Sequence, residues 1–283
     1  MFACKKEEQP ILSIGLIADP QYQDKNTWGK RDYRASIIKL SMAIDSFNIK
    51  EVDFVQNLGD IIDHNWESFD SILNVYESLN SDIENYHLLG NHEYGIDSVY
   101  MSSLLTKLKM PNFYYSYVKK NWRFIILDAT DIAYYSNPLH NRSTREIDEY
   151  FVKSDSLKNR MRWNGAIGQN QLVWLKNELK TAKTEKEKVI LFSHIPIRPA
   201  MNVHNLWNDM EVLKVINDYD HVVAYFNGHN HAGAYEESQG VHYVTMFGMV
   251  ESDNNAFGIL QIFEDKLNLK GFGNQETILM SLE

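Results

Sequence analysis

Metal-ligating side chains follow five separate apolar runs of this 283-residue sequence. The residues are Asp19 and Gln21, Asp60 and Asp63, Asn91 and His92, His194, and finally His229 and His231. Two divalent cations held about 4 Å apart need a shared anionic ligand and a mixture of hard oxygen and imidazole ligands. A water bridging such ions is acidified to hydroxide near neutral pH and can attack phosphorus in line. The residue types therefore predict a dinuclear centre that hydrolyses phosphate esters or anhydrides.

Each of these short motifs is weak evidence when taken alone. "GD" at Gly59 is common in turns, "SH" at Ser193 is common at loop ends, and "GNHE" from Gly90 could begin a helix or form a hairpin. "GHNH" from Gly228 to His231 is the most specific of them. The occurrence of all five in order, each after an apolar run, favours one shared site over five unrelated loops.

The apolar runs read as buried strands separated by amphipathic helices. Strands are predicted at 11–18, 52–58, 85–89, 122–127, 188–193 and 221–226, and helices at 33–47, 66–79, 169–182 and 207–217. This alternation predicts an α/β domain whose ligands lie at the carboxyl ends of the strands, where open α/β sheets place their sites. In the last third, "VHYVTMF", "AFGILQIF" and "KLNLKGF" predict successive antiparallel strands, and hence a mixed or second sheet.

The predicted domain organisation is a tail at 1–10 followed by a single domain at 11–283. The irregular stretch at 131–168 is long for a loop inside a compact domain. We interpret it as a functional insertion or cap.

Composition limits the partners and the location. A hydrophobic content of 44% supports a substantial core, and a net charge of −10 argues against non-specific binding to nucleic acid. No run reaches the ~18 apolar residues of a transmembrane helix. The single cysteine, Cys4, excludes an intrachain disulfide, and its setting in "MFACKKEEQP" resembles the end of a bacterial lipoprotein signal. This predicts a lipid anchor in the bacterial envelope or periplasm; the alternative is a cytoplasmic protein with irregular first residues.

The ordered set of motifs resembles the calcineurin-like metallophosphoesterase superfamily. "IADPQY", "LGDIID", "GNHEYG", "RFIILDATD", "WNGAIGQNQLVWLKNEL", "SHIPI" and "AFGILQIFEDKLNLKGFG" resemble, more narrowly, its manganese-dependent ADP-ribose/CDP-alcohol diphosphatase group. The resemblance runs from about residue 14 to about residue 273. It implies a four-layer α/β/β/α sandwich of two mixed β-sheets flanked by helices, with two divalent ions above the strand ends.

The resemblance also implies a ligand set. One ion would be held by Asp19, Gln21, Asp60 and His231, and the other by Asp60, Asn91, His194 and His229, with Asp60 as the bridge. Many relatives have histidine where this chain has Gln21. An amide oxygen there favours harder ions, so manganese is expected, with magnesium, iron or zinc as alternatives. The other interpretation of Gln21 is a solvent-facing side chain that leaves the first ion weakly held.

His92 and Asp63 are implied to be catalytic residues rather than ligands. In the family, the histidine after the ligating asparagine contacts the phosphoryl group or the leaving oxygen. The residue matching its carboxylate partner is Asp63, which we expect to raise the pKa of His92 and keep it protonated. The competing interpretation of Asp63 is a turn cap.

Substrate contacts are predicted at Trp28, Arg31 and Ile195. An exposed Trp28 could stack on a base and Arg31 could bind a phosphate, although Trp28 could equally pack beneath its loop. Ile195 adjoins His194 and is expected to line the same pocket.

The sequence thus leads to a hypothesis about the substrate, which is expected to be a small nucleotide-derived phosphate compound. The enzyme would cleave the diphosphate of a nucleoside diphosphate linked to a second group, such as ADP-ribose or a CDP-alcohol. The alternative is a phosphodiesterase or phosphomonoesterase acting on cyclic nucleotides, glycerophosphodiesters or other small esters. A non-catalytic scaffold on this fold is disfavoured, because every expected ligand type is present in order.

Overall fold

The computed structural model describes residues 8–154, 158–251 and 253–282, so the predicted lipid anchor at Cys4 lies outside the described residues. Its core is a pair of six-stranded mixed sheets. The first sheet has the order β12-β11-β10-β1-β2-β3. Its strands are β1 (Leu12–Ile17), β2 (Phe54–Asn57), β3 (Glu84–Tyr86), β10 (Ala256–Ile262), β11 (Lys266–Gly273) and β12 (Ile278–Ser281).

The second sheet has the order β4-β5-β6-β7-β9-β8. Its strands are β4 (Tyr115–Lys119), β5 (Trp122–Ile126), β6 (Lys188–Phe192), β7 (Val222–Asn227), β8 (Ala232–Ser238) and β9 (Val241–Phe247). The inner strands β5, β6, β7 and β9 are parallel, as β1, β2 and β3 are in the first sheet. Parallel strands share the direction of their carboxyl ends, so each sheet delivers several loops to one edge.

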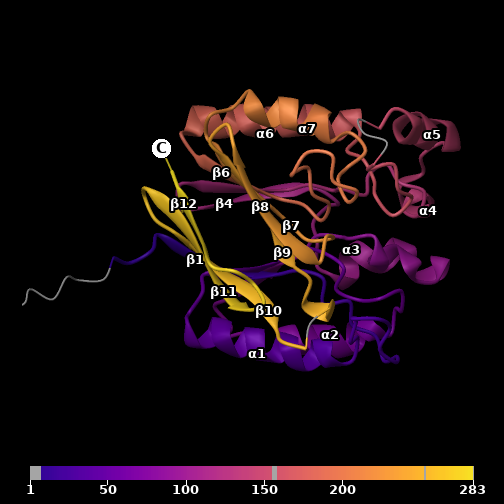
Figure 1. The fold of residues 1–283 in the computed structure, drawn as a ribbon, viewed down its shortest axis with the longest axis horizontal. Helices are drawn as coiled ribbons and strands as arrows, with labels where there is room; N and C mark the ends of the chain where they lie inside the picture. The colour runs from indigo at the N-terminus through magenta and orange to yellow at the C-terminus, as the bar shows by residue number, and fades with distance from the viewer. Residues whose placement is uncertain (1–7, 155–157, 252, 283) are drawn as a thin grey trace, which may run out of the picture.

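Helices cover the outer faces of both sheets, which gives the four layers α/β/β/α (Figure 1). The helices α1 (Ala35–Ile49) and α2 (Ser68–Tyr76) lie along one side, and α6 (Gln169–Glu185) and α7 (Asp209–Asn217) along the other. This is the fold class that the sequence indicated.

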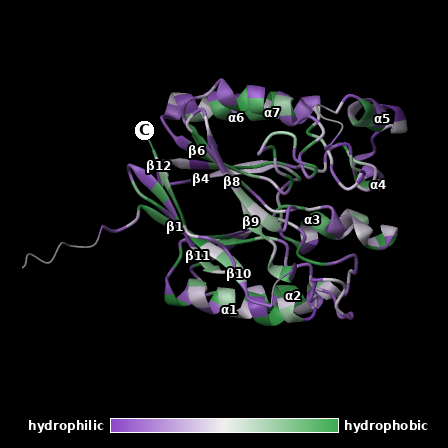
Figure 2. Ribbon diagram, in the orientation of Figure 1, coloured by the Kyte–Doolittle hydropathy of each residue, from purple (hydrophilic) through white to green (hydrophobic). Residues whose placement is uncertain are grey.

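The alternation of side chains along the strands explains how each sheet packs against both of its neighbouring layers. In β2, Phe54 belongs to the cluster between the sheets and Val55 to the cluster under α1 and α2. In β6, Phe192 faces the other sheet and Leu191 packs beneath α6 and α7. Successive side chains of a strand point to opposite faces, so strands that are apolar at every position must be covered on both sides. The hydrophobic colouring of Figure 2 accordingly runs along the strands and recurs on the helices, which carry it mixed with hydrophilic positions.

The last third of the chain differs from its prediction. Strands β10 and β11 are antiparallel neighbours as expected, but β9 lies in the other sheet and runs parallel to β7. Its antiparallel partner is β8, which the sequence did not indicate, as it did not indicate β4 or β12. These three are edge strands in which only Met280 is buried, so they lack the continuous apolar pattern of the inner strands.

The stretch at 131–168 contains two short helices, α4 (Asn137–His140) and α5 (Thr144–Val152). Its two ends meet in an isolated bridge between Ile132 and Ala166. Around Ile132 a small cluster forms with Ile147 and Trp207, which packs the stretch against the segment before α7. The short α3 (Leu104–Lys107) and the 3-10 turns η1 (His92–Gly95), η2 (Ser98–Ser103) and η3 (Met249–Glu251) complete the described elements.

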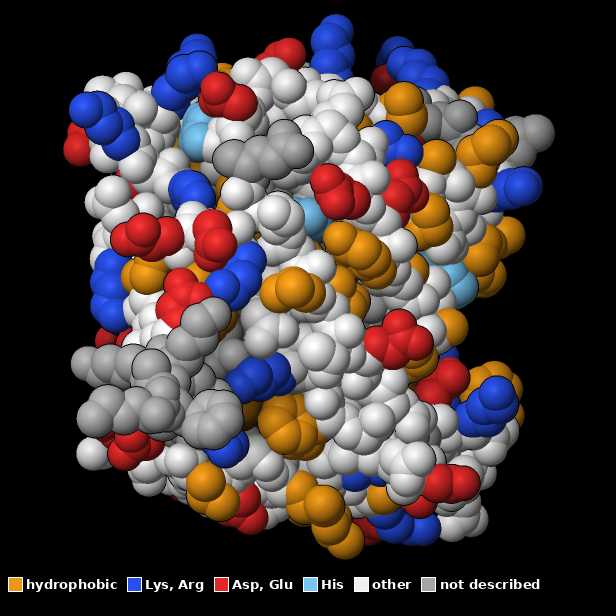
Figure 3. All heavy atoms as spheres, turned by 60° about the vertical axis from the view of Figure 1, so that its left-hand side comes forward, with side chains coloured by type: hydrophobic (Ala, Val, Ile, Leu, Met, Phe, Trp, Pro, Cys, Tyr) orange, Lys and Arg blue, Asp and Glu red, His pale blue; other side chains and the backbone are white. Residues whose placement is uncertain are grey.

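The surface brought forward in Figure 3 carries acidic and basic side chains interspersed with hydrophobic ones. No helix within the described residues has the length and hydrophobicity to cross a membrane.

Candidate metal centre

The loops that follow β1, β2, β3, β6 and β7 bring the seven predicted ligands together. Two overlapping groups of ligand atoms each lie within 4.8 Å: Asp19, Asp60 and His231 form one, and Asp60, His194 and His229 form the other. Asp60 belongs to both groups. This is the arrangement in which one carboxylate could serve two cations.

In the first group, His231 Nε2 lies 3.4 Å from Asp19 Oδ1. Asp19 and Asp60 are buried, as is Gln21. The amide nitrogen of Gln21 lies 3.0 Å from Asp60 Oδ2 and 3.2 Å from His231 Nε2. The structure therefore places Gln21 inside the site, not in solvent.

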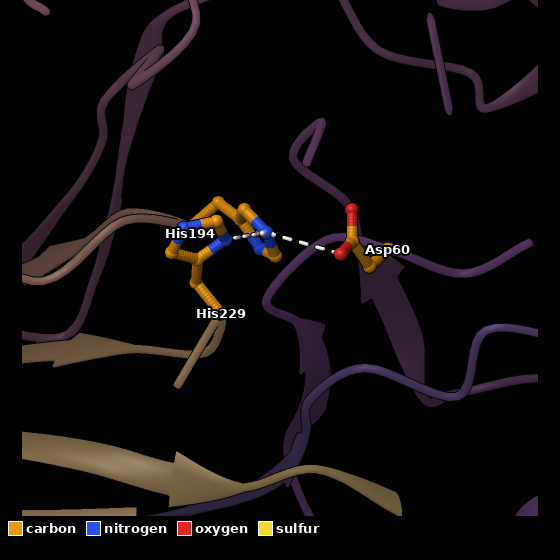
Figure 4. A group of neighbouring side chains, drawn as sticks. All are labelled: Asp60, His194 and His229. Atoms are coloured by element: carbon orange, nitrogen blue, oxygen red, sulfur yellow. Dashed lines mark hydrogen bonds and ion pairs between the residues drawn. The ribbon is translucent and has the colours of Figure 1, made fainter. Parts of the chain in front are cut away.

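In the second group, the His194 ring lies between Asp60 and His229 (Figure 4). Its Nε2 is 3.3 Å from Asp60 Oδ2 and 3.2 Å from His229 Nδ1. Asn91 Oδ1 lies 3.3 Å from the same Nε2, and Nδ1 of His194 is 2.8 Å from the Leu58 carbonyl oxygen. The Leu58 bond fixes the ring so that Nε2 faces the other ligands.

The backbone is unusual at these residues. Asp19, Gln21, Asp60 and His229 have φ of 50°, 43°, 52° and 66°, in the left-handed region that L-residues avoid. Each such residue costs about 1–3 kcal/mol, and residues of this kind cluster at functional sites. Four of the seven predicted ligands therefore sit in backbone conformations that the surrounding structure must enforce.

Gly90 permits the closest approach of two of these loops. A Cβ at this position would lie 2.1 Å from Asp60 Oδ1 and 2.7 Å from the Asp60 nitrogen. The residue before Asn91 must therefore be glycine for the two loops to converge.

The donor set fits hard divalent cations. Carboxylate oxygens, amides and imidazole nitrogens converge, and Oε1 of Gln21 is buried without a hydrogen-bond partner in the described part of the chain. The two amide atoms of glutamine exchange places by a half turn. After this half turn, Gln21 Oε1, Asp60 Oδ2 and His231 Nε2 would surround one point. Three electron-pair donors around a point are the arrangement that binds a cation.

Electrostatics within the cluster are strong. Burial alone would lower the pKa of His194 and His231, but Asp60 and Asp19 respectively outweigh it and raise each pKa to about 9. Burial, followed by the neighbouring His194, holds the pKa of His229 well below its ordinary value. Burial would raise the pKa of Asp60, yet His194 and His92 hold it well below that of a free carboxyl group. The Asp60 carboxylate is thus charged, and the positive charge around it comes from imidazoles whose place a cation could take.

His92 lies at the rim of this cluster. Its Nε2 is 3.8 Å from Asp60 Oδ2, and its Nδ1 contacts Asp63 Oδ1, which is the expected pairing. The expected effect on the pKa is wrong. Burial lowers the pKa of His92 and outweighs the nearby Asp60 carboxylate, and the Arg31 charge lowers it further.

The predicted substrate contacts differ in their surroundings. Trp28 is 71% exposed, and the Arg31 guanidinium lies 5.9 Å from its ring centroid. Arg31 Nε lies 3.3 Å from Glu251 Oε1, which is itself 3.0 Å from His231 Nδ1, so Arg31 lies beside the site. Ile195 is fully buried in the cluster beneath α6 and α7. The expectation that Ile195 lines the pocket is therefore wrong, since the side chain packs into this apolar cluster.

Glu93 is the first of three residues near the ligands that were missed, and the others are Asn164 and Glu251. Glu93 is buried and accepts hydrogen bonds from the backbone nitrogens of Asp60, Ile61 and Gly90 at 3.1, 2.6 and 2.7 Å. Burial and the nearby Asp60 carboxylate raise the pKa of Glu93 to about 7. Glu93 is the last residue of the "GNHE" motif, but the motif does not show that it accepts hydrogen bonds from two loops. That role depends on how closely the Asp60 and Gly90 loops approach each other in the fold.

The second missed residue is Asn164, from the 131–168 stretch. Its Oδ1 lies 2.8 Å from His229 Nε2, which leaves Nδ1 of that ring to face the cluster. The side-chain nitrogen of Asn164 donates to the carbonyl oxygens of Asn159 and Val203. The stretch therefore contributes a contact that orients a predicted ligand.

Comparison with known proteins agrees with this geometry. The family model described as calcineurin-like phosphoesterase matches residues 12–233. The chain belongs to this family. Among curated members, it is 32% identical to the human manganese-dependent ADP-ribose/CDP-alcohol diphosphatase over 99% of this chain and 95% of that protein. It is 30% identical to the Arabidopsis thaliana protein of the same name, over 93% of this chain and 94% of that one.

A solved structure of a dimetal phosphatase shows the same fold over nearly the whole chain. The dimetal phosphatase from Danio rerio is 26% identical, with a TM-score of 0.85, covering 97% of this chain and all of that one. Purple acid phosphatase from yellow lupin shares the fold at a TM-score of 0.61 and 13% identity.

Proposed function

We propose that this protein is a metal-dependent hydrolase that cleaves the diphosphate linkage of nucleoside diphosphate-X compounds such as ADP-ribose and CDP-alcohols. The observation that carries the proposal is the pair of ligand groups that share Asp60. The eight curated relatives, which match over at least 93% of this chain, all bear the name manganese-dependent ADP-ribose/CDP-alcohol diphosphatase. Manganese is accordingly the metal that we assign to the site.

The chain would hold two ions with the seven residues already described. One group is Asp19, Gln21, Asp60 and His231, and the other is Asp60, Asn91, His194 and His229. When bound, two such ions acidify a water and neutralise charge on the phosphoryl oxygens. Because most of these side chains are buried and they converge on two points, they would need little rearrangement beyond the half turn of the Gln21 amide.

His92 is positioned to act on the phosphoryl group or the leaving oxygen. With Nδ1 directed at Asp63, the Nε2 atom faces the shared carboxylate Asp60. Because burial lowers its pKa, the ring is neutral near pH 7 and Nε2 then accepts a proton or a hydrogen bond. Proton donation to a leaving oxygen requires the imidazolium, which the negative charge of a bound diphosphate favours.

Arg31 and Trp28 would bind the part of the substrate that lies beyond the metals. Arg31 supplies a permanent positive charge beside His92 and His231, suited to a phosphate oxygen. Trp28 presents an exposed ring next to that charge, on which a nucleobase could stack. In a nucleoside diphosphate compound, the phosphates would lie at the metals and Arg31, and the base would lie at Trp28.

The test is purified protein with Mn²⁺ assayed against ADP-ribose, CDP-choline and bis-p-nitrophenyl phosphate. We expect turnover of the two diphosphates with a higher kcat/KM than for the aryl ester. Turnover of the aryl ester alone would contradict the diphosphatase assignment and favour the phosphodiesterase. D60A and H194A should abolish activity on all three, and E264A, at an exposed turn residue between β10 and β11, should not.

A further inference from the structure

Glu251 joins the first ligand group to the mouth of the site. It ends η3, the turn between β9 and β10. Its Oε1 lies 3.0 Å from His231 Nδ1 and 3.3 Å from Arg31 Nε. The opposite nitrogen of the same imidazole, Nε2, lies 3.4 Å from Asp19. One carboxylate thus contacts both a predicted metal ligand and a predicted phosphate-binding residue.

The turn that carries Glu251 is fixed to the loops on either side of it. The Val250 nitrogen donates to the Asp19 carbonyl oxygen at 3.0 Å, and the Asp32 nitrogen donates to the Val250 carbonyl oxygen at 3.0 Å. The buried Lys39 ammonium donates to the Met249 carbonyl oxygen at 2.8 Å. Because the backbone is held at the two residues immediately before Glu251, the fold fixes the turn from which the Glu251 side chain projects.

We propose that Glu251 is a positioning residue that orients His231 toward the first ion and holds Arg31 at the substrate entrance. A carboxylate on the remote nitrogen of a ligating imidazole fixes its tautomer and raises its basicity. The second group has no equivalent carboxylate among the described contacts; there the remote nitrogens of His194 and His229 meet Leu58 and Asn164.

The proposal rests on the dinuclear centre of the proposed function but not on its substrate. Loss of such a carboxylate lowers metal affinity by roughly 10- to 100-fold. Its effect should fall on one ion of the two, since Glu251 touches His231 and not His194 or His229. The contact with Arg31 predicts a separate effect on the KM of an anionic substrate.

The experiment compares E251A, E251Q and the exposed control E264A. Free Mn²⁺ is titrated by electron paramagnetic resonance without substrate, and the melting temperature of the chelated protein is measured in parallel. We expect two ions in the wild type and in E264A. In E251A one ion should bind at least tenfold more weakly and the other unchanged, with part of the loss recovered in E251Q, which keeps an acceptor oxygen. If E251A and E251Q bind both ions as tightly as wild type, or lose both equally with a lowered melting temperature, the positioning role is wrong.

The second arm uses R31A, which should raise the KM for ADP-ribose while leaving both Mn²⁺ affinities at wild-type values. E251A should raise KM by a similar factor and weaken one ion in addition. An unchanged KM in E251A would remove the link to Arg31. If the wild type binds two ions but does not hydrolyse ADP-ribose, the substrate assignment fails while the metal titration still decides the role of Glu251.

Discussion

Glu93 offers a quantitative test of how the site is built. Its two carboxylate oxygens accept from Gly90 and Asp60 on one side, at 2.7 and 3.1 Å, and from Ile61 at 2.6 Å on the other. In the isosteric variant E93Q only one oxygen remains, and an NH₂ group faces backbone N–H donors in place of the second. All of these groups are buried, so water cannot replace the lost acceptor.

Orphaning one or two buried N–H groups costs about 1–3 kcal/mol each, so E93Q should lose about 1–6 kcal/mol of folding free energy. At about 2–4 °C per kcal/mol, that corresponds to a melting temperature lower by roughly 2–20 °C. Because Asp60 and Gly90 are the groups released, activity should fall even at temperatures where the variant is folded.

The assay is urea unfolding of the chelated protein. The control is E77Q, at the exposed residue that follows α2. We expect a reduced midpoint for E93Q and an unchanged midpoint for E77Q. An E93Q protein that unfolds like wild type and retains full activity would refute the idea that Glu93 holds the Asp60 and Gly90 loops together.

Three further predictions follow from particular contacts. G90A should displace Asp60, because the added methyl group would lie 2.1 Å from Asp60 Oδ1. We expect a Mn²⁺ titration of this variant to show loss of the metal sites. A variant that still binds two ions would contradict the close approach of Gly90 to Asp60. N164A should weaken Mn²⁺ binding roughly 10- to 100-fold, because it removes the contact that orients His229. The control is N159A, which removes a buried amide bonded to the Leu206 carbonyl oxygen and should leave Mn²⁺ binding unchanged. Equal Mn²⁺ affinities in the two variants would argue against the role of Asn164. The metal-free, chelated protein should lose stability as the pH rises from about 6.5 through 9. The folded-state pKa values of His194 and His231, about 9, lie above the ordinary histidine value of 6.5. The stability that these two groups contribute is therefore complete only below about 6.5 and is lost as they deprotonate in the folded protein. A melting temperature that rises over this range would contradict those pKa shifts.

Much of the fold was predictable from the sequence because buried parallel strands are apolar at every position. The runs at Ile14, Phe54 and Ile190 give this signal directly, and ligands follow such strands at the edge where their carboxyl ends meet. The edge strands β4, β8 and β12 have weaker patterns, and the placement of β9 beside β7 depends on long-range pairing.

Within the site, the residue types could be predicted but not the contacts that orient them. Glu251 and Asn164 touch ligands from distant parts of the chain, and no local pattern marks them. The misplacement of Ile195 has the same origin, because a residue beside a ligand can point to either face of its sheet. The pKa of His92 depends on burial first and then on Asp60 and Arg31, none of which follows from the spacing of Asp63.

Anomalous diffraction from crystals soaked in Mn²⁺ tests the shared role of Asp60 most directly. We expect two anomalous peaks about 4 Å apart, one on each side of the Asp60 carboxylate, with Gln21 Oε1 turned toward one of them. A single peak, or two peaks of which one has no contact with Asp60, would contradict the dinuclear centre.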